Sequence, residues 1–210
     1  VRPGDTVLVS SDMLCYGGLV ASRNGGVPQA EALQRLQILR ELRKREAHLE
    51  VLAIVPRLSL RTSEGEAPYE RKLAIWAGQY DKSPQPADYP VDVPPVWVEE
   101  YLRVRRRNLD ILLEVIGLVQ EGSVDRLVIG QDDSSNHGLH YYDQDQLRQR
   151  IQSLHLEKQV TLLSGADELT MDMFSGRLAD LYDCPPTLGV EYSRPGSEKL
   201  IPPLESHPLE

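Results

Sequence analysis

The chain has 210 residues, of which 40% are hydrophobic and 26% are charged, and its formal net charge at pH 7 is -9. This composition is typical of a soluble globular protein, and the length is sufficient for one substantial hydrophobic core. The acidic balance argues against a general binder of nucleic acids or anionic membranes, because phosphate contacts need a basic surface, and no run of about 18 apolar residues offers a membrane span.

Five short runs rich in apolar and β-branched residues are predicted to be strands. Most of them are continuously apolar rather than alternating, which is typical of strands covered on both faces, as in parallel sheets. In chain order they cover residues 6–12, 50–58, 126–132, 159–165 and 187–193.

Helical patterns alternate with these strands. Leucines recur at helical spacing in the first two, Asp143 and Gln146 have the spacing of a capping box at the start of the third, and Asp167 opens the fourth. This alternation predicts an α/β fold with a mainly parallel sheet flanked by helices. A Rossmann-like open sheet and part of a TIM-type barrel both fit, and we favour the open sheet. The helices are predicted at residues 28–47, 96–121, 143–154 and 167–182.

The connection between the second and third strands, residues 59–95, is longer than the others. It holds a helical pattern near residues 70–79 and a proline-rich segment, residues 82–95, which is predicted to be a loop or a lid. We treat residues 1–210 as a single α/β domain or a fragment of a larger one. The chain does not begin with Met, so we expect N-terminal material to be missing from it.

Other features fit a soluble protein, and a cytoplasmic location is favoured. Cys15 and Cys184 lie far apart and outside any CxxC pattern, which is typical of buried free thiols. The basic run at residues 103–107 lies inside a helical pattern. It is predicted to be a solvated or acid-paired helix face rather than a phosphate track.

Polar side chains gather where the predicted strands end. In parallel α/β folds these ends meet at one edge of the sheet, where ligands bind. We therefore expect Asp12, Arg57, Asp132 and Asp167 around one cleft. The candidates are Asp12, Tyr16, Gly17, Gly18, Ser22 and Arg23 after the first strand, Arg57 after the second, Gln131, Asp132 and Asp133 with His137 and His140 after the third, and Asp167 and Glu168 after the fourth.

Each candidate also has a structural interpretation. Asp167 and Glu168 stand where a helix begins, and acids are favoured there by capping and by the helix dipole. The pair Asp132–Asp133 favours function more strongly. Neighbouring residues in a strand point to opposite faces, so one carboxylate can enter a site while the other anchors the loop.

These residues favour a hydrolase with a carboxylate-based site that acts on a carbohydrate or a related polar metabolite. Glycosidic cleavage needs two carboxyl groups, one acting as acid and the other as base or nucleophile. The catalytic candidates are Asp132 or Asp133 together with Asp167 or Glu168. The substrate-binding candidates are Asp12, Tyr16, Gly17, Gly18, Ser22, Arg23, Arg57 and Gln131.

Alternatives from other classes stay open. The same acids could accept hydrogen bonds from hydroxyls in a non-catalytic sugar- or metabolite-binding module, or merely cap helices in a structural domain. The acid pair needs no cofactor, but a variant of the hydrolase places Mg²⁺ or Mn²⁺ among Asp12, Asp132 and Asp167, because hard cations take oxygen ligands. The distances between carboxyl groups and a pKa shifted towards neutrality discriminate among these interpretations.

Several long motifs resemble, in order and spacing, a bacterial family catalogued as domain of unknown function 4127. They are SSDMLCYGGLVASR, YLRVRRRN, LVIGQDDSSNHGLH, LLSGADELTMDMFSGRLA and VEYSRPGSEKLIPPLESHPL. The resemblance covers nearly the whole chain and implies a central segment of a longer protein, but it implies no activity. The chain departs from the family pattern at Asn136–His137, so His137 and His140 are poor candidates for a shared mechanism. The positions that the resemblance implies are Asp12, Tyr16, Gly17, Gly18, Ser22, Arg23, Arg57, Asn108, Gln131, Asp132, Asp133, Gly138, Gly165, Asp167, Glu168 and Arg177.

Overall fold

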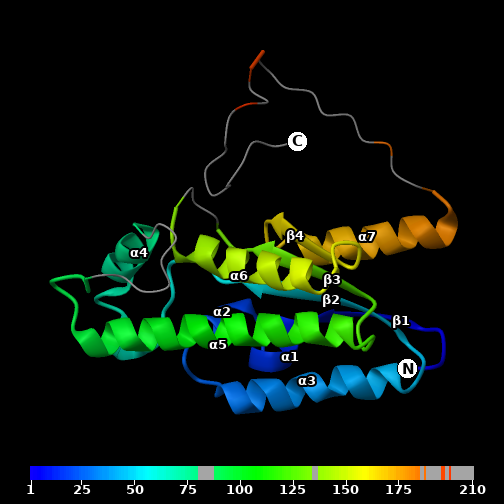
Figure 1. The fold of residues 1–210 in the computed structure, drawn as a ribbon, viewed down its shortest axis with the longest axis horizontal. Coiled ribbons are helices and arrows are strands. Elements are labelled where there is room, and N and C mark those ends of the chain that lie inside the picture. Colours follow the sequence, from blue (N-terminus) through cyan, green and yellow to red (C-terminus); the bar gives the residue numbers. More distant parts are fainter. Residues whose placement is uncertain (80–87, 134–136, 185–186, 188–194, 197–198, 200–210) are drawn as a thin grey trace.

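The computed structural model describes residues 1–79, 88–133, 137–184, 187, 195, 196 and 199. In this part of the chain, four strands form one parallel sheet in the order β1-β2-β3-β4 (Figure 1). The predicted α/β fold with a parallel sheet is confirmed. Residues 188–193 of the predicted fifth strand lie outside the described residues. The strands are β1 (Thr6–Ser10), β2 (His48–Val55), β3 (Arg126–Gln131) and β4 (Val160–Ser164).

Helices cover both faces of the sheet. On one face, α1 (Ser11–Tyr16), α3 (Gln29–Arg43), α5 (Pro95–Gln120) and α6 (Leu139–Ser153) pack on alternate strand residues such as Leu49, Val51 and Ile129. On the other face, Leu169 and Met173 of α7 (Leu169–Tyr182) contact a cluster built on the intervening strand residues. The two central strands, β2 and β3, are therefore buried along nearly their whole length and are mostly apolar.

The long connection after β2 is packed on the body of the protein. It contains a short 3-10 helix, η1 (Glu64–Glu66), and the helix α4 (Glu70–Gly78). Leu73 and Trp76 of α4 join Val98 and Tyr101 of α5 in a second apolar cluster. This cluster anchors the connection at the carboxyl edge of the sheet. Of the predicted loop or lid, residues 82–87 lie outside the described residues, and its last residue begins α5.

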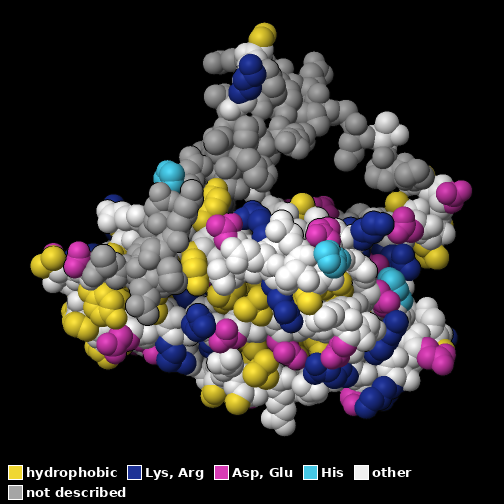
Figure 2. Space-filling model, in the orientation of Figure 1, with side chains coloured by type: hydrophobic (Ala, Val, Ile, Leu, Met, Phe, Trp, Pro, Cys, Tyr) yellow, Lys and Arg dark blue, Asp and Glu magenta, His cyan; other side chains and the backbone are white. Residues whose placement is uncertain are grey.

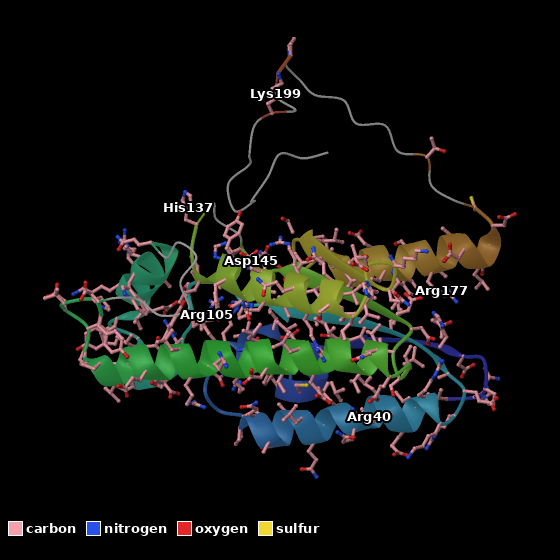
Figure 3. The ribbon with its side chains drawn as sticks, viewed as in Figure 1. Arg40, Arg105, His137, Asp145, Arg177 and Lys199 are labelled. Carbon is pink, nitrogen blue, oxygen red and sulfur yellow. The ribbon has the colours of Figure 1, made fainter. Side chains whose placement is uncertain are left out.

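The predicted start of the third helix is wrong. Helix α6 begins at Leu139, so Asp143 lies inside the helix rather than at its cap. Its buried carboxylate accepts a hydrogen bond from Nε of Arg105 at 3.1 Å, and Arg105 also donates to the carbonyl oxygens of Pro56 and Arg57. Figure 3 shows Arg105 on α5. Asp143 is therefore the partner of a buried arginine and not a helix cap.

The prediction of a solvated or acid-paired basic run is only partly correct. Arg105 is paired with an acid, but it is buried. Arg107 is also buried and donates to the carbonyl oxygens of Ser22 and Val27. These arginines hold α5 against neighbouring segments. The short helix α2 (Leu19–Ser22) is one of the segments held in this way.

The surface carries interspersed charges. Figure 2 shows acidic and basic side chains mixed over the face that α3, α5 and α6 form. One such contact is the 2.7 Å ion pair between Arg40 and Glu121.

Cys15 is buried as predicted, whereas Cys184 is exposed, which corrects the prediction of two buried thiols. Among the described helices, none has both the length and the apolar character that crossing a membrane requires.

Candidate functional site

The carboxyl ends of the four strands bring the predicted site residues to one edge of the sheet. Arg57 follows β2 and forms an ion pair with Asp132, which follows β3. The charge of Asp132 acts on Asp12, and the charge of Asp167 acts on Arg57. The four residues expected around one cleft therefore lie at a common edge.

Asp132 stands at the centre of this edge and holds two arginines. Its Oδ1 accepts from Nη2 of Arg57 at 2.9 Å, and its Oδ2 accepts from Nε of Arg57 at 3.1 Å and from Nη2 of Arg23 at 2.6 Å. The backbone N–H of Asp132 donates to the carbonyl of Val55. Bidentate, charge-assisted contacts of this kind fix geometry as well as charge. Asp132 thus positions both guanidinium groups.

Asp133 is the exposed member of the acid pair. Its side chain is 33% exposed, compared with 4% for Asp132, and its Oδ2 lies 2.5 Å from Nη1 of Arg57. Its φ angle of 42° lies in the left-handed region, which Asp tolerates better than most residues. The turn therefore places a solvent-accessible carboxylate beside a fixed guanidinium.

Arg57 faces three acids. Its hydrogen bonds to Asp132 raise its pKa above the usual value, and the charges of Asp132, Asp133 and Asp167 act in the same direction, while partial burial opposes them. The guanidinium is therefore a fixed positive charge at the centre of the edge.

A pocket of about 510 Å³ opens beside Arg23 and Arg57. Most of its lining was not among the residues predicted for the site, because the candidates in this connection end at Arg57 and only residues 82–95 were predicted to be a loop or a lid. The cluster of hydroxyl and charged residues that directly follows Arg57 is the signal that was available. The polar lining includes Arg23, Arg57 and Arg61, the hydroxyl residues Ser59, Thr62 and Ser63, and Asn24, Glu64 and Glu70.

The acids predicted after β4 lie outside this pocket. Asp167 and Glu168 are exposed and directly precede α7, and neither lines the pocket. Gly130 allows the segment that carries them to cross the end of β3, because an added Cβ would lie 2.5 Å from the carbonyl oxygen of Gly165 and 2.6 Å from Cδ1 of Leu169. The close approach explains glycine at this position in β3.

Several predicted binding residues are buried and do not line the pocket. The carboxylate of Asp12 is buried and accepts from the backbone N–H of Ile54 at 3.1 Å, and burial raises its pKa to about 7. The ring of Tyr16 is buried under the guanidinium of Arg107, with 4.5 Å between the guanidinium carbon and the ring centroid. The hydroxyl of Ser22 donates to the carbonyl of Leu19. Asp12, Tyr16 and Ser22 are thus engaged in contacts within the protein.

Backbone geometry explains the glycine pair. Gly17 caps α1 with a φ of 91°, and Gly18 precedes α2 with a φ of 142°. The buried amide of Gln131 donates to the carbonyls of Val55 and Asp132 and accepts from Gln144. None of these three candidates lines the pocket.

Two positions implied by the family resemblance lie elsewhere. Arg177 lies 3.7 Å from the carboxylate of Glu50 and donates to Thr6, near the start of the strands. Figure 3 shows it at the opposite end of the molecule from His137. Asn108 is buried on α5 and donates to the carbonyls of Ser22 and Val104. Arg177 therefore does not belong to the carboxyl edge.

The two candidate histidines lie outside the pocket. His137 is exposed and His140 is buried in α6, and neither lines the pocket.

Within residues 1–79, 88–133 and 137–184, no three His, Cys, Asp or Glu side chains converge as a group that could hold a metal ion. Both carboxylate oxygens of Asp132 bind arginines. This donor set does not fit a metal site.

A second acid with a raised pKa lies under the pocket wall. Glu66 is completely buried and accepts hydrogen bonds from the backbone N–H and the hydroxyl of Thr62. Burial raises its pKa to about 7, and the charges of Glu100 and Glu70 act in the same direction. The loop that forms one wall of the pocket is thus held by a carboxyl group that titrates near neutrality.

Comparison with known proteins gives a family. A family model described as "Protein of unknown function (DUF4127)" matches residues 1–210. No curated protein and no solved structure matches the chain.

Proposed function

Because the chain belongs to the DUF4127 family, whose description states no activity, we propose a function from the site itself: a hydrolase that acts on a carbohydrate or a related polar metabolite. The reaction takes place at the carboxyl edge of the sheet, where ligands bind in parallel α/β folds.

The observation that carries this proposal is the position of Arg57. Its guanidinium joins the buried carboxylate of Asp132 to the accessible carboxylate of Asp133, next to a polar pocket of about 510 Å³. A pocket of this size accommodates a small molecule. An accessible acid held by a fixed arginine at its rim is suited to act on a bound polar substrate.

The acids have different roles in this reaction. Asp133 acts as the base or nucleophile, and Asp167 or Glu168 supplies the proton to the leaving oxygen, as a pair of carboxyl groups does in glycoside hydrolysis. Asp132 is a positioning residue, because both of its oxygens are bound to arginines. Arg57 fixes Asp133, and Arg23 contacts the substrate.

One observation favours a non-catalytic binding module as the second candidate. The pocket is lined by three arginines and several hydroxyl residues, whereas Asp132, Asp133, Asp167 and Glu168 are absent from its lining. Guanidinium and hydroxyl groups are suited to hold a polar ligand without changing it.

The two candidates are separated by measuring turnover and binding together. We expect the wild-type protein to release p-nitrophenol from at least one member of a panel of p-nitrophenyl glycosides and glycuronides. Asp133→Asn should lower kcat by about 100-fold or more, and either Asp167→Asn or Glu168→Gln should do the same, while circular dichroism and ligand binding are retained.

Asp145→Asn is the matched control, since Asp145 is an exposed acid on α6 that pairs with Arg148. It should leave turnover unchanged. Full activity in the Asp133→Asn, Asp167→Asn double variant would contradict the acid pair. Binding of the panel without turnover in the wild-type protein would favour the binding module.

A further inference from the structure

We infer that the ligand of the pocket carries a carboxylate, and that Glu70 occupies the place of this group in the ligand-free protein. The inference rests on the proposed function, since the same pocket takes the substrate. It concerns recognition only, and it holds for both a hydrolase and a binding module.

Glu70 is held as a bound carboxylate would be. One oxygen accepts from the hydroxyl of Ser59 at 2.7 Å, and the other accepts from Nε of Arg61 at 3.3 Å. All three residues line the pocket. Glu70 comes from α4, whereas Ser59 and Arg61 come from the segment that follows β2. A hydroxyl and a guanidinium thus converge on one carboxylate inside a small-molecule pocket.

The helix position of Glu70 does not explain these contacts. Glu70 stands in the first turn of α4, where an acid is favoured by the helix dipole by about 0.3–1 kcal/mol. That effect accounts for an acid at this position, but it needs neither Ser59 nor Arg61. The pair with Arg61 is exposed, with 62% of the Arg61 side chain accessible, so solvent and mobile ions compete with it. A ligand carboxylate can therefore displace Glu70.

Arg23 provides spare donors on the same pocket. Its Nη2 binds Asp132, and its buried Nε has no hydrogen-bond partner among the described residues. Arg57, by contrast, uses Nε, Nη1 and Nη2 on Asp132 and Asp133. A guanidinium has five N–H donors, so Arg23 retains donors for an anion. The ligand carboxylate is recognised by Arg23 and Arg61, with Ser59 as the neutral donor.

The test uses three probes that differ only at one carbon of the same sugar. D-glucuronate has a carboxylate there, D-glucose a hydroxymethyl group and D-glucose 6-phosphate a phosphate. Binding to the protein is measured by isothermal titration calorimetry at constant ionic strength. We expect the wild-type protein to bind glucuronate at least about tenfold more tightly than glucose, the equivalent of ~1.4 kcal/mol.

Two sets of variants test the residues. Arg61→Gln and Arg23→Gln should each lower the affinity for glucuronate about tenfold and leave that for glucose nearly unchanged. Glu70→Gln should raise the affinity for glucuronate several-fold, because it removes the internal competitor. Arg148→Gln and Glu41→Gln are matched controls, since both side chains belong to exposed ion pairs away from the pocket.

The inference is overturned if glucuronate binds no better than glucose, if it does not bind, or if Glu70→Gln weakens its binding. Tighter binding of glucose 6-phosphate than of glucuronate would overturn the carboxylate in favour of a phosphate. The calorimetric binding test does not depend on turnover. Selective binding of glucuronate by a protein that hydrolyses no glycoside would therefore support this inference and contradict only the proposed hydrolase activity.

Discussion

Arg57 and Asp132 form a bidentate ion pair that joins the ends of two neighbouring strands. Nη2 of Arg57 lies 2.9 Å from Oδ1 of Asp132, and Nε lies 3.1 Å from Oδ2. Arg57 lies two residues after the end of β2, and Asp132 directly follows β3. These two strands are adjacent in the sheet. The pair thus fixes the edge on which the pocket and Asp133 depend.

Removing the carboxylate of Asp132 should destabilise the protein. Asp132→Ala leaves two guanidinium groups without their buried partner, and a loss of about 3–5 kcal/mol in the free energy of unfolding is expected. Asp133→Asn removes a partly exposed contact and should cost less than about 1 kcal/mol. Urea denaturation of both variants measures the difference. Equal losses would show that the two acids support the fold to the same extent.

Protonation of Asp12 should make stability depend on pH. Its pKa is raised from 3.8 in the unfolded chain to about 7 in the folded protein, so its protonation stabilises the fold fully below about pH 4, and this contribution disappears as the pH rises through 7. The contribution is at most about 4 kcal/mol, from ~1.4 kcal/mol per pKa unit. Denaturation between pH 4 and 8 should show a shallower decline for Asp12→Asn.

Glu66 provides the second part of this pH dependence. Its pKa is also raised to about 7, so its contribution is lost over a similar range. Asp12→Asn should therefore retain part of the slope, and the Asp12→Asn, Glu66→Gln double variant should have a shallower slope than either single variant. A wild-type protein whose stability rises between pH 4 and 8 would contradict these assignments.

Gly130→Ala should disturb the loop that carries Asp167. The added Cβ would lie 2.5 Å from a backbone oxygen of Gly165, which cannot move as a flexible side chain can. We expect a loss of about 1–3 kcal/mol and a lower kcat. Gly117→Ala is the control, since its Cβ would meet nothing within 4 Å and alanine favours a helix by about 0.5–1 kcal/mol. Thermal melts showing equal losses in both variants would rule out the steric explanation.

The two histidines that follow β3, His137 before α6 and His140 within it, should behave differently. Neither lines the pocket, so ligand binding should survive substitution of either. His137→Ala changes an exposed side chain and should alter stability by less than about 0.5 kcal/mol. His140→Ala leaves a cavity under α6 and should cost about 2–4 kcal/mol. A specific loss of ligand affinity in His137→Ala with stability unchanged would assign it to the site.

The four described strands and the common edge were predictable because they depend on local patterns. Continuous apolar runs mark strands that are covered on both faces, and parallel pairing then places Asp12, Arg57, Asp132 and Asp167 at one edge. The start of α6 was not predictable in this way. Asp143 and Gln146 have the spacing of a capping box, but the partner of Asp143 is Arg105, which lies 38 residues away.

The pocket depends on contacts of the same long-range kind. Ser59, Arg61 and Glu70 occur in a segment whose polarity resembles that of an ordinary surface loop. Only the apolar contacts of α4 with α5 show that this segment is anchored beside Arg57. The burial of Tyr16 and Ser22 against α5 also depends on partners more than 80 residues away along the chain.

The order of the strands in the sheet has an evolutionary consequence. Because the order in space is the order in the chain, each strand with its following segment contributes one sector of the edge. Residues between 59 and 70 form a wall of the pocket, while the ion pair of Arg23 with Asp132 comes from the sectors on either side. Replacing that one stretch would change what the pocket accepts and preserve this ion pair. Differences in ligand preference among family members are therefore expected to concentrate in this stretch.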